Sequence, residues 1–222
     1  AIMYAVDNGA RVVNMSFGKS VSPEKKWVDD AVKYAESKGV LLVHAAGNDA
    51  ENVDVNDNFP NPDFANDSAT RATNWITVGA SGDPKAGGIT APFSNYGKRE
   101  VDVFAPGVKI YSTLPGGNQY GNLQGTSMAS PVVVGLAALI MSYFPELTDL
   151  QVKSVIEKSV TPLENIKVKK PGTDEDVDLS NISRSGGIIN AYEAIRLAST
   201  LSGEKKVQPV LPKSQLKKSK KD

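Results

Sequence analysis

The sequence predicts an α/β domain in which a mostly parallel sheet carries helices on both faces. Residues 11–16 and 40–45 are short apolar runs, and a segment of helical periodicity separates them. A strand–helix–strand order with apolar strands indicates a parallel pair joined by a right-handed crossover. A second observation is the apolar run at residues 132–141, which predicts a helix that is apolar on every side and lies in the middle of the domain.

Length and composition limit the classes of protein to consider. At 222 residues the chain has the size of one domain with a large core. Its 25 basic residues balance 25 acidic ones, so we expect neither a nucleic acid nor a membrane surface as partner. The absence of cysteine excludes disulfides and thiolate metal sites without fixing the compartment. The run at 132–141 is shorter than the roughly 20 residues that a membrane span needs.

The first residues read as the end of a helix that is already under way. Gly9 fits the C-terminal cap of this helix, and no signal peptide is visible before it. We therefore expect an N-terminal part of the protein to precede Ala1, and the fold to be incomplete on that side.

The segment between the first two strands predicts a helix. Ser22 would be its N-cap and Pro23 its first residue, and Gly39 would end it. Its apolar positions recur at helical spacing, namely Trp27, Val28, Ala31, Val32 and Ala35.

The middle of the chain predicts more strands. Residues 75–80 and 101–105 are apolar and β-branched, as in buried strands. Residues 108–113 and 120–124 predict a hairpin around the turn at 115–118.

The C-terminal part predicts two capped helices with a loop between them. Thr148 and Gln151 form a capping box for the first helix, and Asn190 with Glu193 caps the second. Residues 163–185, basic first and acidic later, are expected to form a charged loop. Residues 203–222 form a lysine-rich segment without the apolar content for a core, and we expect it to be disordered.

Polar residues follow two of the predicted strands. Ser16, Phe17 and Gly18 come directly after the first strand, and Gly47 and Asn48 after the second. Ligands of open parallel sheets bind beyond the carboxyl ends of the strands. These residues are therefore expected to lie at a binding cleft.

The segment Gly125-Thr126-Ser127-Met128-Ala129-Ser130-Pro131 places a serine at the start of the long apolar helix. Free N–H groups and the positive end of the helix dipole favour negative charge there. Pro131 has no N–H, so the carbonyl of Ser127 loses its usual helical partner. This irregularity indicates a functional site at the start of the helix rather than a purely structural helix.

The same segment resembles the nucleophile motif of the subtilases, the subtilisin-like serine proteases. The resemblance covers most of residues 1–160 and includes further motifs in the family's order: Val13-Asn14-Met15-Ser16-Phe17-Gly18, Ala45-Ala46-Gly47-Asn48, Phe93-Ser94-Asn95-Tyr96-Gly97, Ala105-Pro106-Gly107-Val108 and Ser112-Thr113-Leu114-Pro115-Gly116. It implies a subtilisin-like three-layer sandwich, with residues 1–202 as the C-terminal part of the catalytic domain. It also implies a serine endopeptidase acting on polypeptides, either secreted, periplasmic or in the cell envelope.

The resemblance assigns roles to two residues of the reaction. Ser127 would attack the peptide carbonyl and form the acyl-enzyme. The Ser127 N–H and the Asn48 side chain would bind the oxyanion. Without Ser127 downstream, Asn48 after a glycine would be interpreted as an ordinary turn residue.

The resemblance also implies a substrate-binding surface. Ser16, Phe17 and Gly18 would pair with the substrate backbone as a strand does. Ala45 and Gly47 would border the primary specificity pocket.

His44 is the only histidine of the chain, and a serine protease needs one as general base. It lies inside the predicted strand 40–45 and precedes Asn48, so we interpret it as a packed strand residue. In the family the catalytic histidine opens a helix well before this strand. The matching position would lie before Ala1, and the catalytic aspartate earlier still, so we expect residues 1–222 alone to be inactive.

Residues 50–70 are irregular and acidic and contain neither lysine nor arginine. Their carboxylates could hold a structural calcium ion, but the spacing matches no specific calcium motif. We expect a solvated loop over the cleft that shapes substrate subsites, and no required cofactor.

An alternative from a different class is a subtilase-like protein that binds peptides or acts as a scaffold without catalysis. Val132 departs from the family, in which many members carry a histidine at this position. That histidine is not part of the triad, so the departure does not decide between the two hypotheses. Oligomeric state is open.

Overall fold

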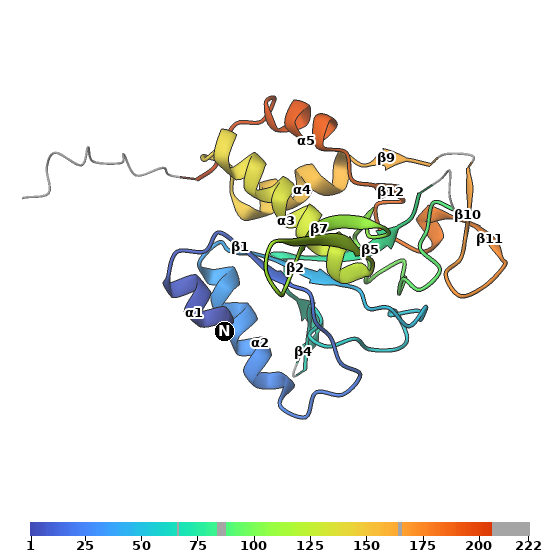
Figure 1. The fold of residues 1–222 in the computed structure, drawn as a ribbon. Helices are drawn as coiled ribbons and strands as arrows, with labels where there is room; N and C mark the ends of the chain where they lie inside the picture. The colour runs from blue at the N-terminus through green and yellow to red at the C-terminus, as the bar shows by residue number, and fades with distance from the viewer. Residues whose placement is uncertain (66, 84–87, 164–165, 206–222) are drawn as a thin grey trace, which may run out of the picture.

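The computed structural model describes residues 1–65, 67–83, 88–163 and 166–205 (Figure 1). Its centre is a six-stranded sheet with the order β1-β2-β5-β6-β12-β9. The pairs from β1 to β12 are parallel, and β9 pairs antiparallel with β12. The strands are β1 (Val12–Met15), β2 (Leu41–Ala45), β5 (Trp75–Ser81), β6 (Val103–Pro106), β12 (Gly187–Ile188) and β9 (Thr161–Pro162).

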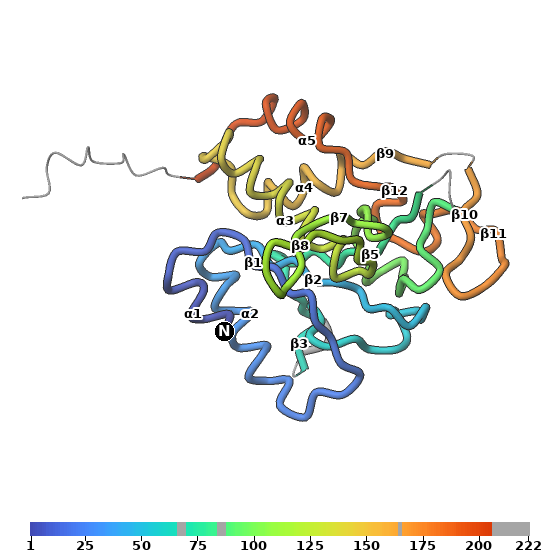
Figure 2. The backbone as a smooth tube through the Cα atoms, in the orientation of Figure 1, coloured from blue at the N-terminus to red at the C-terminus, as the bar shows by residue number. Residues whose placement is uncertain are grey.

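Helices cover both faces of this sheet. One face carries α1 (Ile2–Asp7) and α2 (Lys25–Ser37), and the other carries α3 (Thr126–Tyr143), α4 (Asp149–Lys158) and α5 (Ala191–Ala198). In the tube of Figure 2, the blue N-terminal helices and the red C-terminal helix lie on opposite sides of the strands.

Side chains of β2 alternate between two apolar cores. Leu41 and Val43 belong to the core formed with α3, α4 and α5, whereas Leu42 belongs to the core formed with α1 and α2. All of β2 is buried. Successive side chains of a strand point to opposite faces, so a strand buried on both requires a layer on each side. The predicted α/β sandwich with a mostly parallel sheet is confirmed.

In the part of the chain that the structure describes, three two-stranded sheets lie outside the central one. The predicted hairpin is present as β7 (Ile110–Leu114) and β8 (Gln119–Leu123). β3 (Asp63–Phe64) pairs with β4 (Asp67–Arg71) in the acidic loop.

The third small sheet corrects the predicted charged loop at 163–185. β10 (Lys167–Lys169) and β11 (Asp176–Asp178) pair antiparallel, and the 3-10 helix η1 (Leu179–Asn181) follows. Lys167 lies 2.8 Å from Asp178, and Lys169 lies 2.9 Å from Asp176. Basic residues followed by acidic ones therefore face one another across a hairpin, where opposite charges attract.

The start of α2 also differs from the prediction. The helix begins at Lys25 with Glu24 as N-cap, and the Ser22 carbonyl accepts from the Lys25 N–H in a preceding turn. Trp27 is 72% exposed, whereas Asp29 is buried and accepts from the Ala65 N–H. The apolar spacing predicted the helix correctly but not its start or its full buried face.

α3 is buried on one side only, contrary to the prediction. Val133, Ala137 and Ile140 are buried, but Leu139 and Tyr143 are exposed. Within the described residues, α3 is the one helix whose length and apolar composition would allow it to cross a membrane. Its buried side packs against β5 and the strands beside it.

The other capping predictions, at Gly9, Thr148 and Asn190, are confirmed. Gly9 follows α1 with a φ of +85°, the Thr148–Gln151 capping box opens α4, and Asn190 caps α5 through the Glu193 N–H. The Lys205 N–H donates to the Glu146 carbonyl, which ties the chain to the loop between α3 and α4. The rest of the predicted lysine-rich tail, residues 206–222, lies outside the described residues.

Candidate active site

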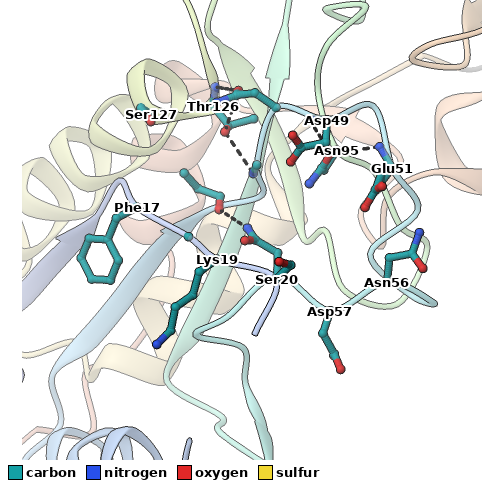
Figure 3. Close-up of a pocket in the computed structure, with 15 residues that line it drawn as sticks. Phe17, Lys19, Ser20, Asp49, Glu51, Asn56, Asp57, Asn95, Thr126 and Ser127 are labelled. Carbon is teal, nitrogen blue, oxygen red and sulfur yellow. Dashed lines mark hydrogen bonds between the residues drawn. The ribbon is translucent and has the colours of Figure 1, made fainter. Parts of the chain in front are cut away.

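A cleft of about 520 Å³ lies beyond the carboxyl ends of the parallel strands. Figure 3 shows Phe17 and Ser127 on one side of it and Glu51 and Asn56 on the other. Its lining brings together Phe17, Gly18, Ala45, Gly47, Asn48 and Ser127, all singled out from the sequence. Ser16, the remaining one, contacts Ser127 directly.

Ser127 lies in the first turn of α3 and is partly exposed to the cleft. Gly125, two residues before Ser127, is the N-cap of α3. Its φ is +146°, a value that glycine adopts readily and other residues rarely do. The Ser127 carbonyl lacks a helical partner because of Pro131, and the Ser16 Oγ donates to it at 2.9 Å. In return the Ser127 Oγ lies 3.4 Å from the Ser16 carbonyl. The expected gap in the helix therefore ties Ser127 to the end of β1.

The amide of Asn48 is held in one orientation by Thr126. The Thr126 N–H donates to Asn48 Oδ1 at 2.8 Å, and the Thr126 Oγ1 lies 3.1 Å from the same oxygen. A backbone N–H can only donate, so the atom facing it must be the amide oxygen. Asn48 Nδ2 is therefore the group directed away from Thr126. Thr126 Oγ1 also accepts from the Gly47 N–H at 3.1 Å.

Asn95 supports the loop that carries Asn48. It is buried, its Nδ2 donates to the Ala46 carbonyl at 2.9 Å, and its Oδ1 accepts from the N–H groups of Asp49 and Glu51. A Cβ on Gly47 would lie 2.3 Å from Asn95 Nδ2, and the φ of Gly47 is +104°. The sequence placed Asn95 in a family motif but did not predict this supporting contact.

His44 lies in β2 with 2% of its surface exposed. Its Nε2 lies 2.8 Å from the Phe17 carbonyl, and its ring is tilted against Trp75 with 5.4 Å between the ring centres. Burial lowers the pKa of His44 from 6.5 to about 4, although the hydrogen bond to Phe17 opposes this. It lines a separate small cavity of about 20 Å³. Its position agrees with the interpretation as a packed strand residue.

The acidic loop contributes polar residues to the cleft, and several of its carboxylates are satisfied elsewhere. Glu51 and Asp57 line the cleft. Asp54 accepts from the N–H groups of Arg99 and Glu100, and Asp63 lies 2.8 Å from Arg99. Across the described ranges, no group of three histidine or acidic side chains could hold a metal ion.

A family model described as the subtilase family matches residues 1–183. Alkaline elastase YaB from Bacillus sp. (strain YaB) is 35% identical over 164 residues, which cover 74% of this chain and 38% of that protein. Subtilisin E from Bacillus subtilis (strain 168) is 39% identical over 167 residues, covering 74% of this chain and 39% of the relative. The chain thus spans well under half the length of these two relatives.

Solved structures show the same fold at a lower identity. The self-cleaved protease domain of PatA superposes with a TM-score of 0.66 at 27% identity, covering 89% of this chain and 65% of that structure. The prenylagaramide maturation protease PagA gives a TM-score of 0.67 at 27% identity, covering 88% of this chain and 65% of the other.

Proposed function

The chain belongs to the subtilase family, and we propose that it forms part of a serine endopeptidase that cleaves polypeptides through an acyl-enzyme on Ser127. The observation that carries this proposal is the arrangement of Asn48, Thr126 and Ser127 at one wall of the cleft. It combines a nucleophile at a helix start with an amide donor whose orientation is fixed.

The chemistry follows from where negative charge develops. Attack by Ser127 Oγ on a peptide carbonyl turns the carbonyl oxygen into an oxyanion. The Ser127 N–H and Asn48 Nδ2 would donate to that oxygen, and the N-terminal end of the α3 dipole would stabilise it further. Because Thr126 holds Asn48 Oδ1, the donor needs little reorganisation during the reaction.

The substrate would bind as an extended strand beside Ser16, Phe17 and Gly18, with its backbone paired to theirs. Ala45 and Gly47, which also line the cleft, would border the pocket for the residue before the cleaved bond. Glu51 and Asp57 of the acidic loop would shape that side of the pocket.

The base that activates Ser127 would be a histidine outside residues 1–222, oriented by an aspartate that also lies outside them. His44 is not suited to this role, since its Nε2 is engaged with Phe17 in the interior. We therefore propose that residues 1–202 are the C-terminal part of the catalytic domain. By the same resemblance, we place the complete protein outside the cytoplasm.

Labelling with a fluorophosphonate probe tests the proposal. The complete protein should be labelled at Ser127, because such probes react with activated serines. Ser127→Ala should abolish the labelling, and labelling that survives the substitution would overturn the assignment. A protein that remains unlabelled but binds extended peptides would instead be the non-catalytic peptide-binding protein.

A further inference from the structure

The segment after β1 is fixed along one edge by two contacts. Lys19 exchanges two backbone hydrogen bonds with Phe59, at 3.0 Å and 2.8 Å. Two residues earlier, the Phe17 carbonyl contacts His44 Nε2 at 2.8 Å. In an extended chain the backbone groups of residues i and i+2 point to the same side. The backbone groups of Phe17 and Lys19 therefore point to the same side, toward His44 and Phe59.

The backbone N–H and carbonyl groups of Ser16 and Gly18 consequently point to the opposite side, away from His44 and Phe59. The Ser16 carbonyl lies 3.4 Å from the Ser127 Oγ, which places it on the cleft side. The Gly18 N–H and carbonyl make no hydrogen bond to the part of the chain that the structure describes. These are the groups that a bound peptide would use for strand pairing.

His44 is a rigid support for this arrangement. Its backbone is in the interior of the sheet, in register with Met15 of β1 and with Thr77 of β5. A carbonyl can only accept, so Nε2 must carry the hydrogen and the ring must be in the Nε2–H form. Burial keeps the ring uncharged at neutral pH, because it lowers the pKa of His44 to about 4.

We propose that His44 is a positioning residue for the substrate: by holding the Phe17 carbonyl inward, it directs the Ser16 carbonyl and the Gly18 N–H toward the bound peptide. The inference rests on the proposed function only in taking an extended peptide as the ligand. It gives the chain's single histidine a role in substrate binding rather than in proton transfer.

The test compares two substitutions in the complete protein. His44→Phe keeps a ring but removes the donor, whereas His44→Gln offers an amide N–H to the same carbonyl. For a tetrapeptide substrate, we expect His44→Phe to lower kcat/KM about tenfold, mainly through KM, because the pairing groups lose their alignment. A single-residue ester, which reaches Ser127 without pairing to Gly18, should change by less than about twofold. His44→Gln should restore hydrolysis of the tetrapeptide.

Thr77→Val is the matched control. Thr77 lines the same small cavity as His44, but its Oγ1 bonds to Trp75 Nε1 at 2.9 Å. This substitution should lower stability and affect both substrates alike. If His44→Phe also affects both substrates alike, or neither, the positioning role is wrong.

A binding measurement distinguishes a failure of this inference from a failure of the proposed function. In the Ser127→Ala background, calorimetry with an uncleaved tetrapeptide should show about tenfold weaker binding for His44→Phe, whether or not the protein is an enzyme. Failure of the proposed function would appear separately, as a Ser127 that the fluorophosphonate does not label. If His44→Phe does not fold, ¹⁵N-histidine NMR of the unsubstituted protein decides. The Nε2–H form of His44 at neutral pH supports the proposal, and the Nδ1–H form overturns it.

Discussion

Acidification should destabilise the folded protein through His44. The folded-state pKa is about 4 because of burial, whereas the unfolded chain titrates near the ordinary value of 6.5. Between these two values the unfolded state takes up a proton that the folded state does not. The contribution of His44 to stability is therefore complete above pH 6.5 and is lost as the pH falls toward 4.

The size of this effect follows from the two pKa values. Each unit of difference corresponds to about 1.4 kcal/mol, so the free energy of unfolding should fall by about 2 kcal/mol at pH 5 and about 3 kcal/mol at pH 4. Glu100 lines the same small cavity and acts in the opposite direction, because burial raises its pKa and protonation then favours the folded state. A comparison with His44→Gln removes that shared contribution.

Urea unfolding of the complete protein in the Ser127→Ala background, which prevents self-digestion, measures the effect. The fluorescence of Trp75, which packs against His44, would report the transition between pH 7.5 and 4. We expect the original protein to lose stability relative to His44→Gln as the pH falls. Parallel curves for the two proteins would refute the argument, since they would show that His44 does not titrate between the two states.

Three further predictions concern the cleft. Asn48→Ala should lower kcat of the complete protein about 100- to 1,000-fold with little change in KM, as loss of the same donor does in subtilisin. An effect confined to KM would make Asn48 a substrate-positioning residue instead. Thr126→Val should lower kcat about tenfold, because Asn48 Oδ1 loses one of its two donors and the Gly47 N–H loses its acceptor, and steady-state kinetics would measure it. Purified residues 1–222 alone should hydrolyse neither casein nor chromogenic peptides, since the proposed base of Ser127 lies outside them. Turnover that disappears in His44→Ala would contradict both the interpretation of His44 and the proposed origin of the triad.

The sheet and the cleft could be predicted because their signals are local. The strands around residues 41–45 and 75–81 are mostly apolar on both faces, a pattern typical of strands that are buried on both sides. The caps at Thr148 and Asn190 depend on residues three positions apart. Ser127 and Asn48 were identified by motif. The strand order predicted that Asn48 would lie at the cleft, and the family resemblance implied that Ser127 would meet it there.

What the sequence did not predict depends on contacts between distant residues. An apolar helix such as α3 does not reveal which of its sides another element covers, so the exposure of Leu139 was missed. The β10–β11 hairpin appears in the sequence only as two blocks of opposite charge. The contact of His44 with Phe17 and that of Thr126 with Asn48 join residues 27 and 78 positions apart, and neither has a local signature.

The hydrogen bond from Ser16 to Ser127 determines when the cleft can form during synthesis of the chain. It joins residues 111 positions apart, so the site closes only when β1 and the start of α3 are both in place. A chain made from its N-terminus presents Ser16 and Asn48 long before Ser127 exists. In the proposed endopeptidase, an unfinished chain therefore lacks the side chain that attacks the peptide bond until the start of α3 has been made.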